Sequence, residues 1–222
     1  MHNIVNNLLS IKNELKIKIK KLNFENYNPN IVAVSKTFTI KDILPLINHG
    51  HLHFGENKVQ ESIEKWTSIK NDFKDIKLHM IGKLQTNKVK YVVPLFDYIH
   101  SVDSFKLAEK ISQQQVKNNK IMKLFIQINI GDENQKNGIL IDELDKFYNK
   151  CTNDLGLNVI GLMCLPPNDN KSQIYFSKMK ELVGKLKLKD ISMGMSNDYL
   201  KAIKYGSTFV RIGSAIFGER KV

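Results

Sequence analysis

The feature of this sequence that most constrains its fold is an alternation of short apolar runs with longer amphipathic segments. The short runs, several of them rich in β-branched residues, are typical of buried strands and cover residues 31–34, 52–55, 78–82, 98–102, 123–130, 159–163, 190–195 and 208–212. Segments with apolar residues three and four positions apart indicate helices over residues 3–22, 40–48, 57–69, 87–94, 104–117, 142–151, 172–187 and 198–205. Strands that alternate with helices in this way form right-handed βαβ units around a parallel sheet.

The number of these units favours a closed (β/α)8 barrel, preceded by one additional helix over residues 3–22. The chain has no Gly/Ser/Pro-rich stretch and no break in composition, so we expect a single domain over residues 1–222. A length of 222 residues is small for such a barrel but sufficient. A doubly wound open sheet is the alternative, and the count of eight units favours the barrel.

Composition excludes several classes of protein. With 42% hydrophobic residues the chain is able to bury a substantial core, and disorder is not expected. No apolar run approaches the roughly 18 residues of a membrane helix, and residues 1–25 contain no continuous apolar stretch typical of a signal peptide. Cys151 and Cys164 do not form a disulfide framework, so we expect a reduced, cytoplasmic setting.

The formal net charge of +12 raises the possibility of a nucleic acid or anionic surface as partner. Of the 34 basic residues, however, only Arg211 and Arg220 are arginines, and the lysines are spread along the whole chain. Specific contacts with nucleic acids favour the planar fork of arginine. We therefore interpret the charge as solvated surface and expect neither a nucleic-acid nor a membrane partner; a lysine-rich binder of anionic polymers is the weaker alternative.

Lys36 is the first candidate for chemistry. In a (β/α)8 barrel the reactive groups lie at the carboxyl ends of the strands, and Lys36 comes two residues after the first apolar run. A lysine that is partly desolvated among apolar walls has a lowered pKa and more free amine, as Schiff-base formation requires. A lysine that extends past the strand end into water is an equally weighted alternative.

Two turns form a second candidate. Ser196 follows the seventh predicted strand, and Gly213 and Ser214 follow the eighth. Backbone N–H groups in a Gly-containing turn at a helix start bind phosphate, and barrels often hold a phosphate at these two loops. Ordinary turn and N-cap roles are the alternative, and the pairing of the two turns at this place favours phosphate.

Arg211 is the third candidate, because it lies within the eighth apolar run. Its planar guanidinium remains protonated, and inside a barrel mouth it would meet a pyridine nitrogen or a carboxylate. A structural ion pair with one of the acids of the barrel is the alternative.

The remaining conspicuous residues are interpreted as structural. The alternating histidines His49, His51 and His53 lack a neighbouring carboxylate or Cys cluster, so no metal site is predicted. Four other side chains are interpreted as core, helix N-terminal or ion-pair residues rather than catalytic groups: Cys164, Trp66, Glu56 and Glu61.

Motifs along nearly the whole chain resemble one family. They are IVAVSK at 31–36, FGENKVQE at 54–61, HMIGKLQTNK at 79–88, QIN at 127–129, KNG at 136–138, GLMCLPP at 161–167, SMGMS at 192–196 and VRIGSAIFGER at 210–220. A lysine after strand one, opposite a phosphate turn and an arginine at strand eight, is an arrangement typical of pyridoxal phosphate sites. The chain resembles the pyridoxal phosphate homeostasis proteins, small relatives of the N-terminal barrel of alanine racemase.

The resemblance implies a set of cofactor-binding residues. Pyridoxal 5′-phosphate would be held as a Schiff base on Lys36, with Ser196, Gly213 and Ser214 at the phosphate and Arg211 near the pyridine nitrogen. Ser214 stands where the family often has Thr, which preserves the hydroxyl. The implied set is Lys36, Asn57, Met163, Ser196, Arg211, Gly213 and Ser214, in which the asparagine and the methionine line the pocket.

The resemblance also implies a function in cofactor homeostasis without established catalysis. The implied partners are pyridoxal phosphate, pyridoxal-phosphate-dependent apoenzymes and free amino acids, and we expect a monomer. A weak amino-acid racemase, or a barrel aldolase that uses Lys36, is the alternative. Racemisation requires a second base, for which Tyr98, His79 and His100 are candidates, although no motif marks any of them.

Overall fold

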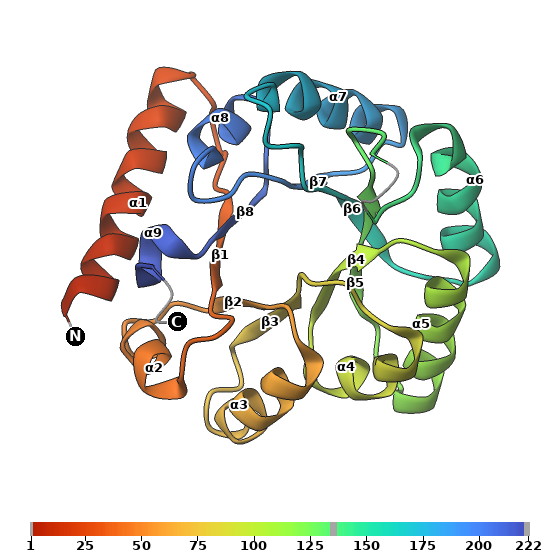
Figure 1. Ribbon diagram of the computed structural model, residues 1–222, viewed down its shortest axis with the longest axis horizontal. Coiled ribbons are helices and arrows are strands. Elements are labelled where there is room, and N and C mark those ends of the chain that lie inside the picture. Colours follow the sequence, from red (N-terminus) through yellow and green to blue (C-terminus); the bar gives the residue numbers. More distant parts are fainter. Residues whose placement is uncertain (1, 134–136, 220–222) are drawn as a thin grey trace.

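The predicted alternation is present as a ring of parallel strands that closes into a barrel (Figure 1). The computed structural model describes residues 2–133 and 137–219, so Lys136 and Arg220 of the sequence motifs lie outside the described residues. The strands are β1 (Asn30–Val34), β2 (His53–Glu56), β3 (Lys77–Met80), β4 (Tyr98–Val102), β5 (Lys123–Ile128), β6 (Val159–Cys164), β7 (Asp190–Ser192) and β8 (Phe209–Ile212). Parallel pairing of β1 with β8 closes the sheet, which confirms the barrel and excludes the doubly wound alternative.

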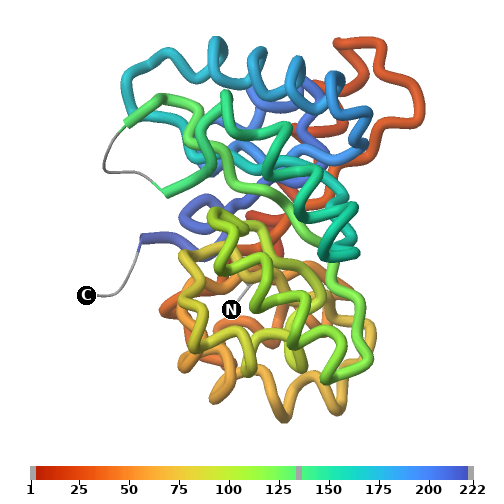
Figure 2. Tube along the Cα trace, turned by 90° about the vertical axis from the view of Figure 1, so that its right-hand side faces the viewer, coloured from red at the N-terminus to blue at the C-terminus, as the bar shows by residue number. Residues whose placement is uncertain are grey.

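The helices form the outer wall of the barrel. They are α1 (His2–Lys21), α2 (Ile40–Asn48), α3 (Val59–Asp72), α4 (Val89–Leu95), α5 (Phe105–Asn118), α6 (Leu144–Asn149), α7 (Ser172–Lys185), α8 (Tyr199–Lys204) and α9 (Ser214–Phe217). Helix α1 precedes the first strand, as predicted. The side view shows α2–α4 and α7–α8 on opposite sides of the barrel (Figure 2).

Several predicted element boundaries differ from the observed ones by a few residues, and three of the differences are informative. The seventh strand ends at Ser192 rather than at residue 195. Met193 and Gly194 each still form one backbone hydrogen bond with β8, and the φ of +90° at Gly194 then turns the chain away. The helix predicted over 87–94 begins with a 3-10 turn at Thr86–Lys88. The helix predicted over 142–151 is divided among a 3-10 turn, α6 and a π-helical turn, so the local hydrogen bonding changes twice where the pattern suggested one helix.

The alternation of side chains along each strand separates two apolar layers. The larger layer lies between strands and helices and contains residues such as Ile31, Phe54 and Trp66. A smaller cluster fills the barrel interior and consists of Val32, Tyr98, Phe125, Met163 and Phe209. The interior is therefore a packed core, and a ligand has room only at its ends.

Helix α1 packs across the seam between the last and the first strand. It buries Leu8, Ile11 and Leu15 and contacts α8 and α9. The Asn7 side-chain amide donates to the Ile216 carbonyl at 2.9 Å. The helix thus joins the start of the chain to the elements that flank β8.

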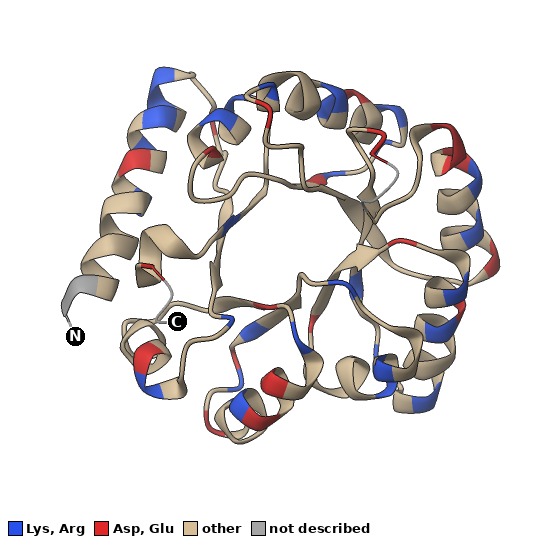
Figure 3. Cartoon of the chain, in the orientation of Figure 1, with Lys and Arg blue, Asp and Glu red and all other residues tan. Residues whose placement is uncertain are grey.

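The charges are distributed around the outer wall. Lys and Arg are interspersed with Asp and Glu on the ring of helices (Figure 3). This distribution supports the interpretation of the positive charge as solvated surface. Among residues 2–133 and 137–219, no helix has both the length and the apolar character needed to cross a membrane.

Candidate functional site

The predicted site residues gather at the carboxyl ends of the barrel strands. This follows from the topology, because all eight strands are parallel and their carboxyl ends meet at one end of the barrel. Arg211 lies within β8 and Met163 within β6, one residue before its end. The other predicted site residues come after strands at this end. They are Lys36 after β1, Asn57 after β2, Ser196 after β7, and Gly213 and Ser214 after β8.

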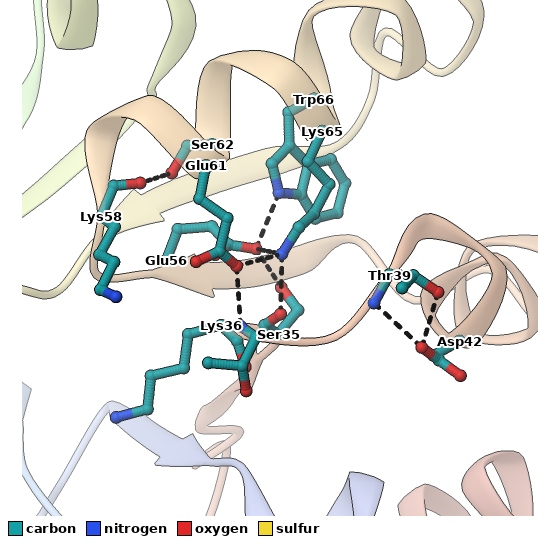
Figure 4. A network of polar contacts seen from close by, with 11 residues as sticks. Ser35, Lys36, Thr39, Asp42, Glu56, Lys58, Glu61, Ser62, Lys65 and Trp66 are labelled. Carbon is teal, nitrogen blue, oxygen red and sulfur yellow. Dashed lines mark hydrogen bonds and ion pairs between the residues drawn. The ribbon is translucent and has the colours of Figure 1, made fainter. Parts of the chain in front are cut away.

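The backbone before Lys36 is held by a buried polar network (Figure 4). The Ser35 hydroxyl donates to Glu56 Oε1 at 2.7 Å, and Lys65 Nζ donates to the Ser35 carbonyl at 2.9 Å. Lys65 Nζ also lies 3.0 Å from Glu56 Oε1. The side chain of Lys36 is half-buried and points away from this network. The hydrogen bonds of Ser35 therefore fix the backbone that carries the Lys36 amine.

The backbone after Lys36 is held as well. Thr37 has φ +68°, a left-handed conformation that is strained for a β-branched residue. The Thr37 N–H donates to Glu61 Oε1 at 2.7 Å, and the same oxygen accepts from Lys65 Nζ at 2.9 Å. Lys65 thus links Glu56 and Glu61, and through them both neighbours of Lys36.

Glu56 is the most buried carboxylate of this network. Its side chain is 0% exposed, and Oε1 also accepts from the Trp66 indole N–H at 2.9 Å. Burial raises the pKa of Glu56, and the ammonium of Lys65 opposes that rise. The predicted ion-pair role is confirmed for Glu56 and Glu61, and Trp66 is a core residue that also donates a hydrogen bond.

Arg211 extends into the barrel interior and is only 3% exposed. Its Nη1 donates to the Ser192 hydroxyl oxygen at 2.5 Å and its Nη2 to the Cys164 carbonyl at 2.8 Å. Within the described residues it forms no ion pair with a carboxylate, so the structural ion pair considered above is not present there. Burial lowers the pKa of the guanidinium. A buried cation without a carboxylate partner is costly, so a further electron-rich group beside it would be stabilising.

The loops after β7 and β8 meet at one hydroxyl group. The backbone N–H groups of Gly213 and Ala215 both donate to Ser196 Oγ, each at 3.3 Å. Amide groups that converge on one oxygen are able to bind an anion in the same way. Ser214 lies between them in sequence and is exposed at the same place.

Asn57 carries a free acceptor beside a close backbone contact. Its Oδ1 is buried and has no hydrogen-bond partner among the described residues. A Cβ atom on Gly82 would lie 2.3 Å from the Asn57 carbonyl oxygen, so only glycine allows the loop after β3 to approach the loop after β2 this closely. Met163 lies deeper, fully buried in the interior cluster.

The three alternating histidines point toward different partners. His51 Nε2 contacts the His53 carbonyl at 2.9 Å, and the His53 ring turns instead toward His79. Over the described ranges, no group of three His, Cys, Asp or Glu side chains is placed to hold a metal ion. His49 ends helix α2 and is exposed.

Both cysteines are expected to be inert toward thiol reagents in the folded protein. Cys151 and Cys164 are buried, and burial raises the pKa of each thiol to about 12. The thiolate is the reacting species, so its population near neutral pH is very small. Titration with a chromogenic disulfide should modify neither residue in buffer and both in denaturant. Rapid labelling of the native protein would contradict the assignment of Cys164 to the core.

Lys65 is the residue of this site that the sequence interpretation missed. The spacing of Glu61 and Lys65, four positions apart on a predicted helix, indicates an ion pair. That spacing says nothing about Ser35 and Glu56, because contact with them depends on how α3 packs against β1 and β2. The pairing of α3 with the Lys36 loop is visible only in the folded chain.

Comparisons with known proteins agree with this architecture. Residues 11–221 match the family described as alanine racemase, N-terminal domain. The sequence is 38% identical over 228 residues to the pyridoxal phosphate homeostasis protein of Haemophilus influenzae, an alignment that covers 98% of this chain and 96% of that protein. The structure of PipY from Synechococcus elongatus with pyridoxal phosphate bound matches with a TM-score of 0.80 and 30% identity, over 92% of this chain and 100% of that one. Alanine racemase from Bartonella henselae, at 14% identity and a TM-score of 0.69, covers 95% of this chain and 61% of its own; it shares the fold.

Proposed function

The chain belongs to the pyridoxal phosphate homeostasis protein family, and on this basis we propose that it binds pyridoxal 5′-phosphate and takes part in controlling the supply of that cofactor. The observation that carries the proposal is the position of Lys36, two residues after β1, and of Arg211, within the paired strand β8, at the carboxyl end of the barrel. When bound, the cofactor supplies an aldehyde carbon that condenses reversibly with primary amines. Lys36 is the amine that would hold it covalently.

Three features of the chain fit this cofactor. The Gly213 and Ala215 amides converge on Ser196 Oγ, where the oxygens of a phosphate would find donors. Arg211 is a buried cation whose hydrogen bonds go to neutral acceptors, so its charge remains available to the ring nitrogen. Asn57 Oδ1 is a buried acceptor without a partner in the described part of the chain. The residues that would hold the cofactor are Lys36, Asn57, Met163, Ser196, Arg211, Gly213 and Ser214.

We propose a carrier of the cofactor rather than a catalyst. A guanidinium beside the ring nitrogen disfavours protonation of that nitrogen, and this weakens the ring as an electron sink. Racemisation would also need a second base at the mouth. The candidates for this base are engaged elsewhere: His79 and His100 are buried and bonded to each other at 2.9 Å, and Tyr98 stacks on His79 with ring centroids 4.1 Å apart.

Isotope exchange distinguishes a cofactor carrier from a racemase. Protein loaded with an equimolar amount of pyridoxal phosphate is desalted and incubated in deuterated water with L-alanine. We expect no more deuterium at the α-carbon than free pyridoxal phosphate produces, because Arg211 disfavours protonation of the ring nitrogen and so weakens the electron sink that removal of this proton requires. In parallel, a pyridoxal-phosphate-dependent apoenzyme added to the loaded protein should regain activity as the carrier loses its cofactor absorbance. Sustained exchange that depends on the protein would overturn the carrier assignment in favour of a racemase.

A further inference from the structure

A chain of polar side chains crosses the interior of the barrel beneath Arg211. His53 Nδ1 lies 2.9 Å from His79 Nε2, and His79 Nδ1 lies 2.9 Å from His100 Nε2. His100 Nδ1 lies 2.8 Å from Ser192 Oγ, the oxygen that also accepts from Arg211 Nη1. Side chains from β2, β3, β4, β7 and β8 are thus joined in one path.

The stagger of the barrel explains how three histidines meet end to end. His53 is in register with Lys77, and His79 lies two residues further along β3. His79 is in register with Tyr98, and His100 lies two residues further along β4. Each step therefore moves one strand around the barrel and one inward-facing position toward the carboxyl end. From His100 the path crosses the interior to Ser192 on β7.

The buried histidines of this series of polar side chains are neutral. His79 and His100 are fully buried, and burial holds the pKa of each well below its ordinary value. A protonated His100 would lower the pKa of His79 further, and the charge of Arg211 lowers the pKa of His100 further. Each ring therefore carries one hydrogen, and each contact between rings requires one nitrogen to donate and the other to accept.

Arg211 determines the direction of these hydrogen bonds. A guanidinium only donates, so Ser192 Oγ accepts from Nη1 and keeps its own hydrogen to donate. Among the described residues the remaining partner of Ser192 Oγ is His100 Nδ1. If His100 donated instead, the buried hydroxyl hydrogen of Ser192 would have no acceptor there, which is costly. His100 therefore carries its hydrogen on Nε2 and donates it to His79 Nδ1. His79 in turn carries its hydrogen on Nε2 and donates it to His53 Nδ1.

We propose that Ser192, His100, His79 and His53 form a positioning chain for Arg211, in which each histidine is neutral and carries its hydrogen on Nε2. This order leaves the Ser192 oxygen free to accept from the guanidinium, which is anchored there and at the Cys164 carbonyl. The directions of the hydrogen bonds do not depend on the proposed function. Only the identity of the ligand beside Arg211 rests on it. The four residues are positioning residues, because they act on the cofactor through Arg211.

The outer end of the chain opens toward solvent. His53 is half-buried and borders a pocket of about 800 Å³ at the amino ends of the strands, opposite the candidate site. In the proposed order its Nε2–H is the terminal donor and faces no acceptor among the described residues. The series of hydrogen bonds thus begins at Arg211, which only donates, and ends at His53 Nε2–H, which donates to solvent.

Nitrogen NMR tests the hydrogen order without any cofactor. Protein labelled with 15N-histidine, and assigned with single His→Gln variants, should show His79 and His100 with Nδ1 unprotonated and Nε2 protonated at neutral pH. The exposed ring of His49 is the internal reference for a solvent-facing histidine. A doubly protonated ring, or a hydrogen on Nδ1 of His100, would overturn the proposal even if pyridoxal phosphate binds.

Substitution of Ser192 tests the positioning role. Ser192→Ala removes one of the two anchors of Arg211, and we expect pyridoxal phosphate to bind roughly tenfold more weakly, the effect of losing one hydrogen bond to a charged group. The absorbance maximum of the bound cofactor should shift, and Ser192→Thr should restore both properties. Ser207→Ala is the matched control, because Ser207 is equally buried between β7 and β8 but donates to the Met193 carbonyl. Equal cofactor affinity and equal absorbance in the two alanine variants would refute the positioning role. A wild-type protein that does not bind pyridoxal phosphate would refute only the proposed function.

Discussion

Lys36→Ala is expected to abolish covalent attachment of pyridoxal phosphate to the chain. Lys36 is the lysine that follows β1 at the mouth of the barrel, with both of its sequence neighbours held by hydrogen bonds. Wild-type protein mixed with equimolar cofactor and reduced with borohydride should gain the mass of one phosphopyridoxyl group. The variant should gain none, because a methyl group offers no amine. Intact-mass spectrometry measures both outcomes directly.

The control for this experiment is the substitution of a second lysine that lies close to Lys36 in the sequence. Lys41 is exposed on α2, and Lys41→Ala should be labelled as fully as the wild type. Because the chain contains many lysines, the labelled peptide of the wild type must also be identified. A phosphopyridoxyl group on any other peptide, or on the Lys36→Ala variant in the same amount, would refute the assignment of Lys36.

Lys65→Met should have the largest effect on stability. The side chains of Lys65 and Glu56 are 7% and 0% exposed, and the two charged groups lie 3.0 Å apart. Removal of the ammonium leaves a buried carboxylate without its counter-charge. Breaking a buried pair in this way costs about 3–5 kcal/mol of unfolding free energy. Urea denaturation near neutral pH measures the loss.

This loss depends on pH in a direction that the burial of Glu56 determines. Burial raises the pKa of Glu56 above its ordinary value of 4.5, and removal of Lys65 raises that pKa further. Between the unfolded and folded pKa values the folded state of the variant binds more protons, so its stability falls as pH rises. At about pH 4 Glu56 is largely protonated in both states, and the part of the difference from the wild type that Glu56 causes should largely disappear.

Two further variants separate charge from packing. The double variant Lys65→Met/Glu56→Gln removes both charges and should recover much of the stability lost at neutral pH. Lys178→Met breaks an exposed pair with Glu181 and should change stability by no more than about 0.5 kcal/mol. If the loss in Lys65→Met is the same at every pH, the missing contribution is packing of the lysine stem, and the electrostatic account is wrong.

The barrel could be predicted from the sequence because it depends on local patterns. Short apolar runs and amphipathic segments alternate, and their number is enough to favour closure. Lys36 and the loops of Ser196 and Gly213 could be placed for the same reason, since the carboxyl end of a parallel strand is a position in the sequence. The end of β7 could not, because its limit is set by the positive φ of Gly194.

The polar network around Lys36 and the histidine chain depend on packing that no local pattern contains. Contact of Lys65 with Ser35 requires α3 to lie against β1, thirty positions earlier in the chain. His79 and His100 could be recognised as titratable groups on strands, but the stagger between β3 and β4 decides that they meet each other. A shift of one residue in that register would turn them to opposite faces of the sheet.

Because β1 pairs with β8, the two parts of the candidate site are made at different times during translation. Lys36 leaves the ribosome early, whereas Arg211 and Gly213 follow much later, and the Asn7–Ile216 hydrogen bond joins residues 209 positions apart. Contacts between such distant segments are slow to form, because loop-closure entropy opposes them. A nascent chain therefore presents the amine of Lys36 before the groups that would orient a cofactor beside it exist. If the chain binds pyridoxal phosphate as proposed, stable loading would coincide with closure of the barrel, and the bound cofactor would report that the whole ring of strands is complete.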